Sequence, residues 1–341
     1  MILVTGGTGF VGSHMLAKIV EENRPVKAFH RPHSDFSELK KVFQRHFGEA
    51  WEARFNTITW YCGNLSNPVD IAGFIGEGDI VFHCAGTIRF DKKGIDSLYR
   101  NNVRATELLV NESLEKQVAY FSHLSSVAAF GEWPEGSLIN EHSAFNGRRK
   151  DSHYFYSKFQ SEMEVWRGFE EGLKGSIVNP GVILGSGFWR TGSNQIIRAT
   201  AKGIPFYPDG IGSFVSVEDV TSIMWELFTR GIHGERYILV SDNQPHVDFL
   251  TLLCSELGVK PPKKQLGRIS YFIMRYLLGP GISLLGKPNP FPPSFIRGMK
   301  SKTRFEAHKI EDLLGRKLKG IDRFIPEIAS VYKKEEMELK A

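Results

Sequence analysis

A tyrosine and a lysine that could cooperate in proton transfer stand four residues apart, at Tyr154 and Lys158. Side chains at this spacing lie on the same face of a helix. An unperturbed tyrosine has a pKa of about 10, so it is a weak acid or base catalyst at neutral pH. Because a nearby ammonium stabilises the phenolate, we expect Lys158 to lower the pKa of Tyr154. The pair predicts general acid/base chemistry on Tyr154.

Two serines, Ser125 and Ser126, follow a predicted buried strand at Val118–Leu124. In a parallel sheet, ligands gather beyond the carboxyl ends of the strands. A hydroxyl group there could hold a substrate carbonyl beside the phenol of Tyr154. The alternative is that these serines only cap the end of the strand.

Three glycines at regular spacing, Gly6, Gly9 and Gly12, follow the apolar run Ile2–Thr5. A bound pyrophosphate needs bare backbone N–H groups and the positive end of a helix dipole. Glycines allow the tight turn, the close approach of the ligand and the contact of helix with strand. Because the triplet follows a predicted strand and precedes a predicted helix, it predicts a dinucleotide-binding turn.

The second predicted strand ends in His30-Arg31-Pro32. An acidic residue at this point would bind the ribose 2′-hydroxyl of NAD, and none is present. Arginine forms paired, charge-assisted hydrogen bonds with phosphate. We therefore expect NADP(H) to be preferred. NAD(H) is the alternative, with Arg31 as a solvated loop residue.

These residues need a scaffold, and the first 180 residues alternate short apolar runs with longer amphipathic ones. Strands rich in Val, Ile and Phe that alternate with helices indicate an α/β fold, with a parallel sheet covered on both faces. Right-handed crossovers make such a sheet doubly wound. The predicted strands are Ile2–Thr5, Val26–His30, Thr57–Cys62, Asp79–Cys84, Val118–Leu124 and Lys174–Asn179, and the predicted helices are Phe10–Glu22, Phe36–Phe47, Ile95–Leu114 and Ser152–Glu171.

The pattern loosens after residue 180. We expect residues 1–180 to form a dinucleotide-binding domain of the Rossmann type and residues 181–341 to form mainly a smaller substrate-binding domain. A strand–helix–strand pattern within residues 212–240 is expected to return to the first domain. The charge-rich tail from Val331 to Ala341 is expected to fray.

The composition is that of a soluble globular protein, with 41% hydrophobic and 24% charged residues in a chain of 341. It excludes collagen-like, low-complexity and wholly disordered chains. We see no signal peptide and no run near the ~20 apolar residues of a membrane span, so we expect a cytoplasmic protein. The three cysteines match no metal-binding or disulfide pattern, so we expect no metal. Cys62 and Cys84 are expected as small residues of buried strands.

Taken in order, the motifs resemble those of the extended short-chain dehydrogenases/reductases, the family of NAD(P)-dependent epimerases and dehydratases. The resemblance extends from Met1 to about Val240. It rests on Thr5-Gly-Gly-Thr-Gly-Phe-Val-Gly12, Gly63-Asn64-Leu65, His83-Cys-Ala-Gly86, Asn102-Val-Arg-Ala-Thr106, Ser125-Ser126, Tyr154-x-x-x-Lys158, Asn179-Pro-Gly181 and Phe214-Val-Ser-Val-Glu-Asp219.

The resemblance implies a role for individual residues. Ser126 matches the catalytic serine, Tyr154 the general acid/base, and Lys158 the partner that also holds the nicotinamide ribose. Most members have Asp where this chain has Asn64. The cofactor-binding residues implied are Gly6, Gly9, Phe10, Val11, Gly12, Arg31, Asn64, Leu65, Ala85, Gly86, Asn102, Ser125, Tyr154, Lys158, Pro180 and Val182.

The family includes nucleotide-sugar enzymes and also reductases of bulkier apolar ketones. Sugar-nucleotide members usually carry an arginine near the Phe214 motif to hold the diphosphate, and residues 209–214 contain none. Aromatic walls suit an apolar ligand, unless these rings form the core of the cap. The candidate cap rings are Phe188, Trp189, Phe206, Tyr207, Phe214, Tyr271 and Phe272.

We therefore predict an NADP(H)-dependent oxidoreductase that transfers hydride between the nicotinamide and a carbonyl or secondary alcohol of a small apolar substrate. This pattern resembles dihydroflavonol reductases and 3β-hydroxysteroid dehydrogenases. The alternative is a nucleotide-sugar epimerase or dehydratase that retains its NAD(P).

The positive charge lies at the C-terminal end. Residues 256–341 carry 18 basic and 9 acidic side chains, a net charge of +9, against −4 for residues 1–255. No nucleic-acid-binding motif accompanies them, so we expect no nucleic-acid partner. The apolar segment 269–286 could contact an anionic membrane surface, but we favour a buried helical hairpin that closes the substrate pocket. Members of the family often form dimers through two helices, so a homodimer is possible.

Overall fold

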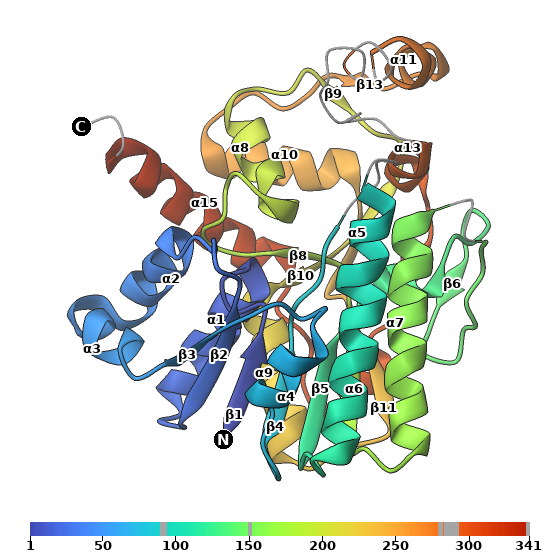
Figure 1. Cartoon of the computed structure of the whole chain (residues 1–341). Helices are drawn as coiled ribbons and strands as arrows, with labels where there is room; N and C mark the ends of the chain where they lie inside the picture. The colour runs from blue at the N-terminus through green and yellow to red at the C-terminus, as the bar shows by residue number, and fades with distance from the viewer. Residues whose placement is uncertain (89–93, 149–151, 279–281, 283–292, 339–341) are drawn as a thin grey trace.

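A seven-stranded parallel sheet with helices on both faces forms the centre of the molecule (Figure 1). The computed structural model describes residues 1–88, 94–148, 152–278, 282 and 293–338. Across the sheet, the strands lie in the order β11 (Glu235–Leu239), β7 (Gly175–Pro180), β5 (Tyr120–Leu124), β4 (Ile80–His83), β1 (Ile2–Thr5), β2 (Val26–His30) and β3 (Thr59–Cys62).

The strand order reverses direction between β1 and β4. From β1 the chain builds outward through β2 to β3, then returns to β4 on the other side of β1 and continues to β11. Ligands of such sheets bind in the crevice outside the carboxyl ends of the strands, at this reversal. The predicted doubly wound parallel sheet is confirmed, and the crevice lies beside the glycine turn that follows β1.

Both faces of the sheet are buried, which explains the continuous apolar runs of its strands. Because side chains alternate along a strand, Ile2 and Val4 enter one core and Leu3 enters the other. The first core is covered by α1 (Phe10–Glu21), α2 (Ser37–Phe47) and α9 (Val217–Thr229), and the second by α4 (Pro68–Phe74), α6 (Ala105–Glu115) and α7 (His153–Glu170).

A smaller layer lies beyond the carboxyl ends of the strands, at the top of Figure 1. Its third apolar core includes Trp189 and Phe214, so these two predicted cap rings are core residues. The ring of Phe214 stacks on Phe249, with 4.2 Å between the centroids. The layer contains β8 (Val182–Leu184), β10 (Ile211–Ser216), β12 (Asp242–Pro245), α8 (Gln195–Ala201), α10 (His246–Leu257) and α15 (Ile321–Glu338).

Short elements complete the described chain. These elements are α3 (Trp51–Phe55), α5 (Ile95–Tyr99), β6 (Leu138–Ile139), β9 (Phe206–Tyr207), β13 (Lys264–Gln265), α11 (Arg268–Ile273), α13 (Pro293–Lys300), β14 (Arg304–Phe305) and α14 (His308–Leu314). Two two-stranded pairs join β9 to β13 and β6 to β14.

The C-terminal tail differs from its prediction. The segment expected to fray from Val331 is helical through Glu338, and residues 339–341 lie outside the described part. The helix continues because Ile328 and Tyr332 are buried in the third core, beside α10. Lys333, Lys334 and Glu338 are exposed, whereas Glu335 accepts hydrogen bonds from Arg45 and Trp189 and helps to anchor the helix.

The two cysteines expected in buried strands are also placed differently. Cys62 is exposed and Cys84 is partly exposed. Cys62 ends β3, which is the edge strand of the sheet, and Cys84 follows directly after β4. Both lie at the carboxyl edge rather than in the core.

The segment predicted as a buried hairpin over 269–286 is helical but open to solvent where it is described. Ile269 is 77% and Leu277 is 61% exposed, and Tyr271 is the buried residue of this stretch. The prediction of burial is wrong for residues 269–278, because one narrow side of the helix packs on the molecule. Residues 279–281 and 283–286 lie outside the described residues.

Two histidines lie inside the sheet. The ring of His83 is hydrogen bonded to Thr5 Oγ1 at 2.7 Å and to Thr106 Oγ1 at 2.9 Å. The ring of His123, whose centroid is 5.1 Å away, finds no hydrogen-bond partner among the described residues. Burial lowers the pKa of His83 from 6.5 to about 3 and that of His123 well below its usual range. Both rings are therefore neutral at pH 7.

Stability should fall in acid because of these groups, and His123→Leu tests this. A buried neutral histidine takes up a proton only on unfolding, so its contribution is present above pH ~6.5 and is lost as the pH falls. The variant breaks no hydrogen bond of His123 among the described residues. The free energy of unfolding, measured with urea, should fall less between pH 7 and pH 5 in the variant than in the wild type. The reason is that the variant takes up about one proton fewer on unfolding at pH 5. An identical pH dependence would contradict the burial of this ring as a neutral group.

Candidate active site

A large cavity opens at the carboxyl ends of the strands, between the β1–β4 reversal and the small sheet. Its volume is about 2480 Å³. Its wall brings together most of the residues predicted from the sequence: Gly9, Phe10, Val11, Gly12, Arg31, Asn64, Ala85, Gly86, Ser125, Ser126, Tyr154, Lys158, Pro180 and Val182. Gly6, Leu65 and Asn102 do not line it.

The glycine turn leaves no room for side chains at two positions. Gly6 has φ +70°, and a Cβ atom there would lie 2.7 Å from the backbone nitrogen of Ala85. A Cβ atom on Gly12 would collide with the carbonyl oxygen of Gly6. Gly9 precedes α1 without a side-chain cap, and the first turn holds no acidic residue. The first N–H groups of α1 are therefore suited to an anion such as a pyrophosphate.

At the end of the cavity beside β2 and β3, only one of the two neighbouring residues expected to bind the cofactor, Asn64 and Leu65, lines the wall. Asn64 Oδ1 accepts a hydrogen bond from the backbone N–H of Ser66 at 3.0 Å, and Asp70 Oδ2 accepts one from the backbone N–H of Asn64 at 2.7 Å. Leu65 packs against the second core instead of the cavity. Arg31 is exposed on the wall, and no acid of the described residues pairs with it.

Asn102 is buried behind the cavity wall and does not line the cavity. It is 2% exposed, and its side chain accepts a hydrogen bond from the backbone N–H of Thr87 at 2.7 Å. It also donates to the carbonyl of Thr87 and to Ser157 Oγ, both at 3.0 Å. The predicted helix Ile95–Leu114 contains a π turn, Arg100–Arg104, at this residue. The amide thus joins the loop after β4 to α7 and positions the wall.

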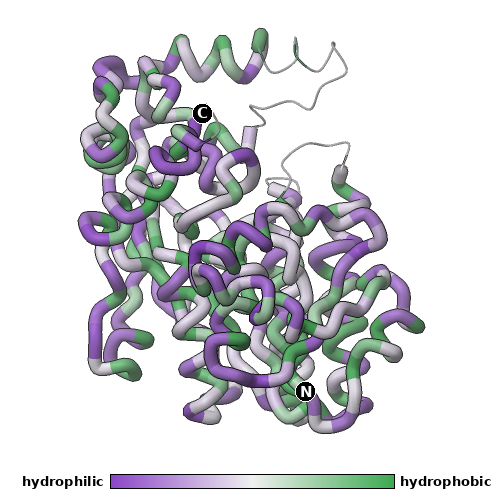
Figure 2. The backbone as a smooth tube through the Cα atoms, turned by 90° about the vertical axis from the view of Figure 1, so that its left-hand side faces the viewer, coloured by the Kyte–Doolittle hydropathy of each residue, from purple (hydrophilic) through white to green (hydrophobic). Residues whose placement is uncertain are grey.

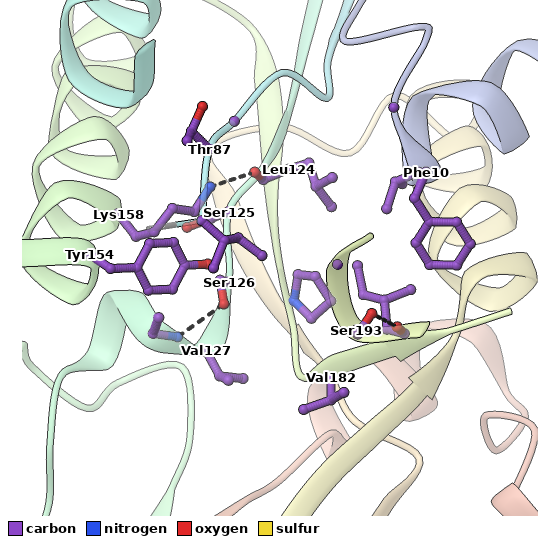
Figure 3. A pocket seen from close by; sticks show the side chains of 18 of the residues that line it. Phe10, Thr87, Leu124, Ser125, Ser126, Val127, Tyr154, Lys158, Val182 and Ser193 are labelled. Atoms are coloured by element: carbon purple, nitrogen blue, oxygen red, sulfur yellow. Dashed lines mark hydrogen bonds between the residues drawn. The ribbon is translucent and has the colours of Figure 1, made fainter. Parts of the chain in front are cut away.

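The predicted catalytic residues meet at the floor of the cavity (Figure 3). α7 begins after Ser152, whose hydroxyl accepts a hydrogen bond from the backbone N–H of Phe155 at 3.3 Å. This cap places Tyr154 in the first turn and Lys158 one turn later. Ser126 is the second residue after β5, and its hydroxyl lies at the same place.

Burial decides the protonation state of the pair. Removal from water raises the pKa of Tyr154 from 10.0 to about 12, while a hydrogen bond with Ser126 acts in the opposite direction. Lys158 Nζ donates to the carbonyl of Leu124 at 3.0 Å, and burial lowers the pKa of the lysine from 10.5 to about 8. The predicted lowering of the tyrosine pKa is wrong here, because desolvation outweighs stabilisation of the phenolate. At pH 7 the pair is a neutral phenol and a cation.

A buried carboxylate on α7, one turn beyond the lysine, was not identified from the sequence. Glu162 is 2% exposed and accepts hydrogen bonds from Ser125 Oγ at 2.6 Å, Asn179 Nδ2 at 2.7 Å and Arg236 Nη1 at 2.9 Å. Asn179 Nδ2 also donates to the carbonyl of Ser126 at 3.1 Å. The available signal was spacing, because a residue four positions after the lysine shares its buried helix face.

The glycine turn gives a direct test of ligand binding. In Gly12→Ala the added methyl group should displace the first turn of α1, because it collides with a backbone carbonyl. We expect at least ~10-fold weaker binding of NAD⁺ and NADP⁺ by titration calorimetry. Gly267→Ala is the control, since no atom lies within 4 Å of the added Cβ. Unchanged affinity in Gly12→Ala would show that the turn does not hold the dinucleotide.

Comparison with known proteins agrees with this geometry. The chain is 28% identical over 244 residues to sterol demethylase protein B of Methylococcus capsulatus, covering 71% of this chain and 70% of that protein. It is 25% identical over 320 residues to a putative dihydroflavonol 4-reductase of Synechocystis, covering 92% and 88%. The crystal structure of gox2253 has 27% sequence identity and a TM-score of 0.78, with 98% of both chains covered.

The family described as NAD dependent epimerase/dehydratase matches residues 2–239. These bounds coincide with the start of β1 and the end of β11, which are the first and last strands of the large sheet in chain order. The chain therefore belongs to the NAD dependent epimerase/dehydratase family and is an NAD(P)-dependent enzyme of the extended short-chain dehydrogenase/reductase type.

Proposed function

We propose that the enzyme is an NADP(H)-dependent reductase of small apolar ketones or aldehydes, or the matching alcohol dehydrogenase in the reverse direction. The observation that carries the proposal is the neutral, buried phenol of Tyr154 beside Ser126 at the cavity floor. A phenol with a pKa of about 12 keeps its proton at neutral pH. It can therefore donate that proton to a developing alkoxide.

The residues at the site can divide the work of carbonyl reduction. The hydride would come from bound NADPH. Ser126 Oγ, which accepts a hydrogen bond from the backbone N–H of Ala128 at 3.2 Å, would orient the carbonyl oxygen. Tyr154 would transfer its proton to that oxygen. Burial favours loss of the charge of Lys158, but the nearby Glu162 carboxylate opposes this loss, so the lysine stays cationic at pH 7. Lys158 would hold the nicotinamide ribose.

Preference for NADP(H) rests on the wall near Arg31. The positive side chain has no acidic partner among the described residues and could bind a 2′-phosphate. Asp35 lies on the same part of the wall, but its carboxylate accepts hydrogen bonds from the backbone N–H and hydroxyl of Ser37, at 2.8 and 2.9 Å. This acid is thus engaged at the start of α2.

An apolar substrate fits the remaining wall. Val127, Val182 and Phe10 line the cavity, and Figure 3 places Phe10 across it from Tyr154. Phe188, one of the predicted cap rings, also lines it. Such walls favour ligands that bury apolar surface, with the polar floor setting the orientation.

The cavity is poorly equipped for a sugar diphosphate. Residues 209–214 hold no arginine, and neither Arg190 nor Arg198 lines the cavity. Of three cations on the cap side, two are already paired with glutamates, Arg297 at 2.9 Å and Lys302 at 2.8 Å, and the third, Lys300, lies over the ring of Tyr271. The likeness to a putative dihydroflavonol 4-reductase also supports a reductase.

Replacement of the phenol tests the proposed chemistry. Tyr154→Phe should keep its affinity for NADPH and lower kcat at least ~100-fold, because the proton donor is lost. The assay follows NADPH oxidation with the best substrate in a panel of apolar ketones and aldehydes. Tyr156→Phe is the matched control, because its ring packs against Phe145 outside the cavity wall. Wild-type turnover by Tyr154→Phe would refute the mechanism.

Replacement of the arginine tests the cofactor preference. Arg31→Ala should weaken NADP⁺ binding by about 10-fold or more and leave NAD⁺ binding within about 2-fold, because in our proposal the guanidinium would contact only the extra phosphate. Calorimetric titration with each cofactor measures the change. Arg24→Ala removes the same charge away from the cavity and serves as the control. Equal losses for both cofactors would contradict this role of Arg31.

A further inference from the structure

An apolar helical face lies open to solvent at the upper edge of the molecule (Figure 1). It belongs to α11 and the π turn Met274–Leu278, which together extend from Arg268 to Leu278. Of its six exposed large apolar side chains, all but Leu278 recur three and four positions apart, at Ile269, Phe272, Ile273, Tyr276 and Leu277. This spacing makes one stripe along a helix, and the stripe faces outward instead of toward a core. We call it the outer face.

The opposite side of the helix attaches it to the protein. Tyr271 is buried, and its hydroxyl oxygen accepts a hydrogen bond from the backbone N–H of Asp209 at 3.3 Å. Lys300 Nζ of α13 lies 5.3 Å from the centroid of the Tyr271 ring. In Figure 2 the helix that leads into the long grey trace lies along the upper margin and carries green, hydrophobic stretches. The anchor therefore holds the outer face away from the body of the protein.

The sequence on either side of the outer face is cationic. Residues 257–305 contain ten Lys or Arg and no Asp or Glu. Among the exposed cations of this stretch, five have no acidic partner in the described ranges and lie between the end of α10 and the end of the outer face: Lys260, Lys263, Lys264, Arg268 and Arg275. Apolar side chains flanked by cations without acidic partners are complementary to a surface in which anionic groups lie above an apolar layer.

We propose that the outer face binds the headgroup region of an anionic lipid bilayer. The helix of 11 residues is only about 16 Å long, about half the ~30 Å thickness of the hydrocarbon layer. Among the described helices, none is long and apolar enough to cross a membrane. The helix lies in the plane of the interface, with the apolar stripe at the acyl boundary and the cations on lipid phosphates.

A second copy of the chain is a poorer occupant. Two-fold pairing of identical faces would bring Arg268 and Arg275 of one copy toward the same two cations of the other. The positive charges of Lys263 and Lys264 would add to the repulsion between the two copies, since residues 257–305 contain no acidic residue to offset them. Like charges at such a contact repel, whereas an anionic lipid surface attracts them.

The contact would place the bilayer close to the cavity. Tyr271 of the anchored helix touches α13 (Pro293–Lys300), and α13 contributes Ser294, Phe295 and Arg297 to the cavity wall. An apolar substrate dissolved in the membrane would have a short path to that wall. This consequence rests on the proposed function, but the lipid contact itself does not.

Vesicle sedimentation of the full-length chain tests the proposal without any substrate. The wild type should sediment with phosphatidylcholine vesicles that contain phosphatidylserine, and less with phosphatidylcholine alone or at high salt. The double variant Phe272→Asp/Leu277→Asp should partition at least ~10-fold less. Val69→Asp, on α4 and 76% exposed in the wild type, is the matched control and should bind normally. Lys263→Gln/Lys264→Gln should weaken only the binding that depends on phosphatidylserine.

Three results would overturn the proposal. The first is absence of wild-type binding to the anionic vesicles, and the second is equal binding by the wild type and the Phe272→Asp/Leu277→Asp variant. The third is self-association of the wild type in light scattering that the double variant abolishes while vesicles bind neither protein. That result would make the outer face a contact between copies. Thermal midpoints within a few degrees for all variants exclude unfolding as the cause of any loss.

Discussion

The geometry of the active site depends on one buried carboxylate. An ionised carboxylate inside a protein is costly unless hydrogen bonds and a counter-charge compensate it. Glu162 finds both only when α7, β5, β7 and β11 are correctly aligned, since Ser125, Asn179 and Arg236 come from three different strands or strand ends. The same alignment fixes the backbone of Ser126 through Asn179. The chemistry of the cavity floor is therefore tied to the packing of the sheet behind it.

Most of the fold could be predicted because its signals are local. Short apolar runs and amphipathic segments alternate along the first 180 residues, and right-handed crossovers leave few ways to order the strands. The failures concern contacts between distant residues. Tyr332 is buried by packing of α15 beside α10, and Cys62 is exposed because its strand lies at the sheet edge. Neither fact has a local pattern in the sequence.

In the active site, too, local patterns were predictable and contacts between distant residues were not. Spacing on one helix was enough to pair Tyr154 with Lys158, and the end of a predicted strand was enough to place Ser126 beside them. Arg236 lies 74 residues from Glu162 in the chain, so no local pattern links the two. The direction of the pKa shift of Tyr154 was also predicted wrongly. The spacing of residues indicates a nearby charge but does not indicate that the side chain is removed from water. Burial is a property of the whole fold.

A reductase of the kind we propose binds NADPH and releases NADP⁺ at each turnover. A retained NAD⁺, recycled within one catalytic cycle, would belong to an epimerase or dehydratase instead. The most direct measurement is the cofactor content of the purified protein before and after exhaustive dialysis, by mass spectrometry of the released nucleotide. Our account predicts a protein that dialysis frees of nucleotide and that then binds one NADP⁺ more tightly than NAD⁺. One NAD⁺ per chain that survives dialysis would contradict it.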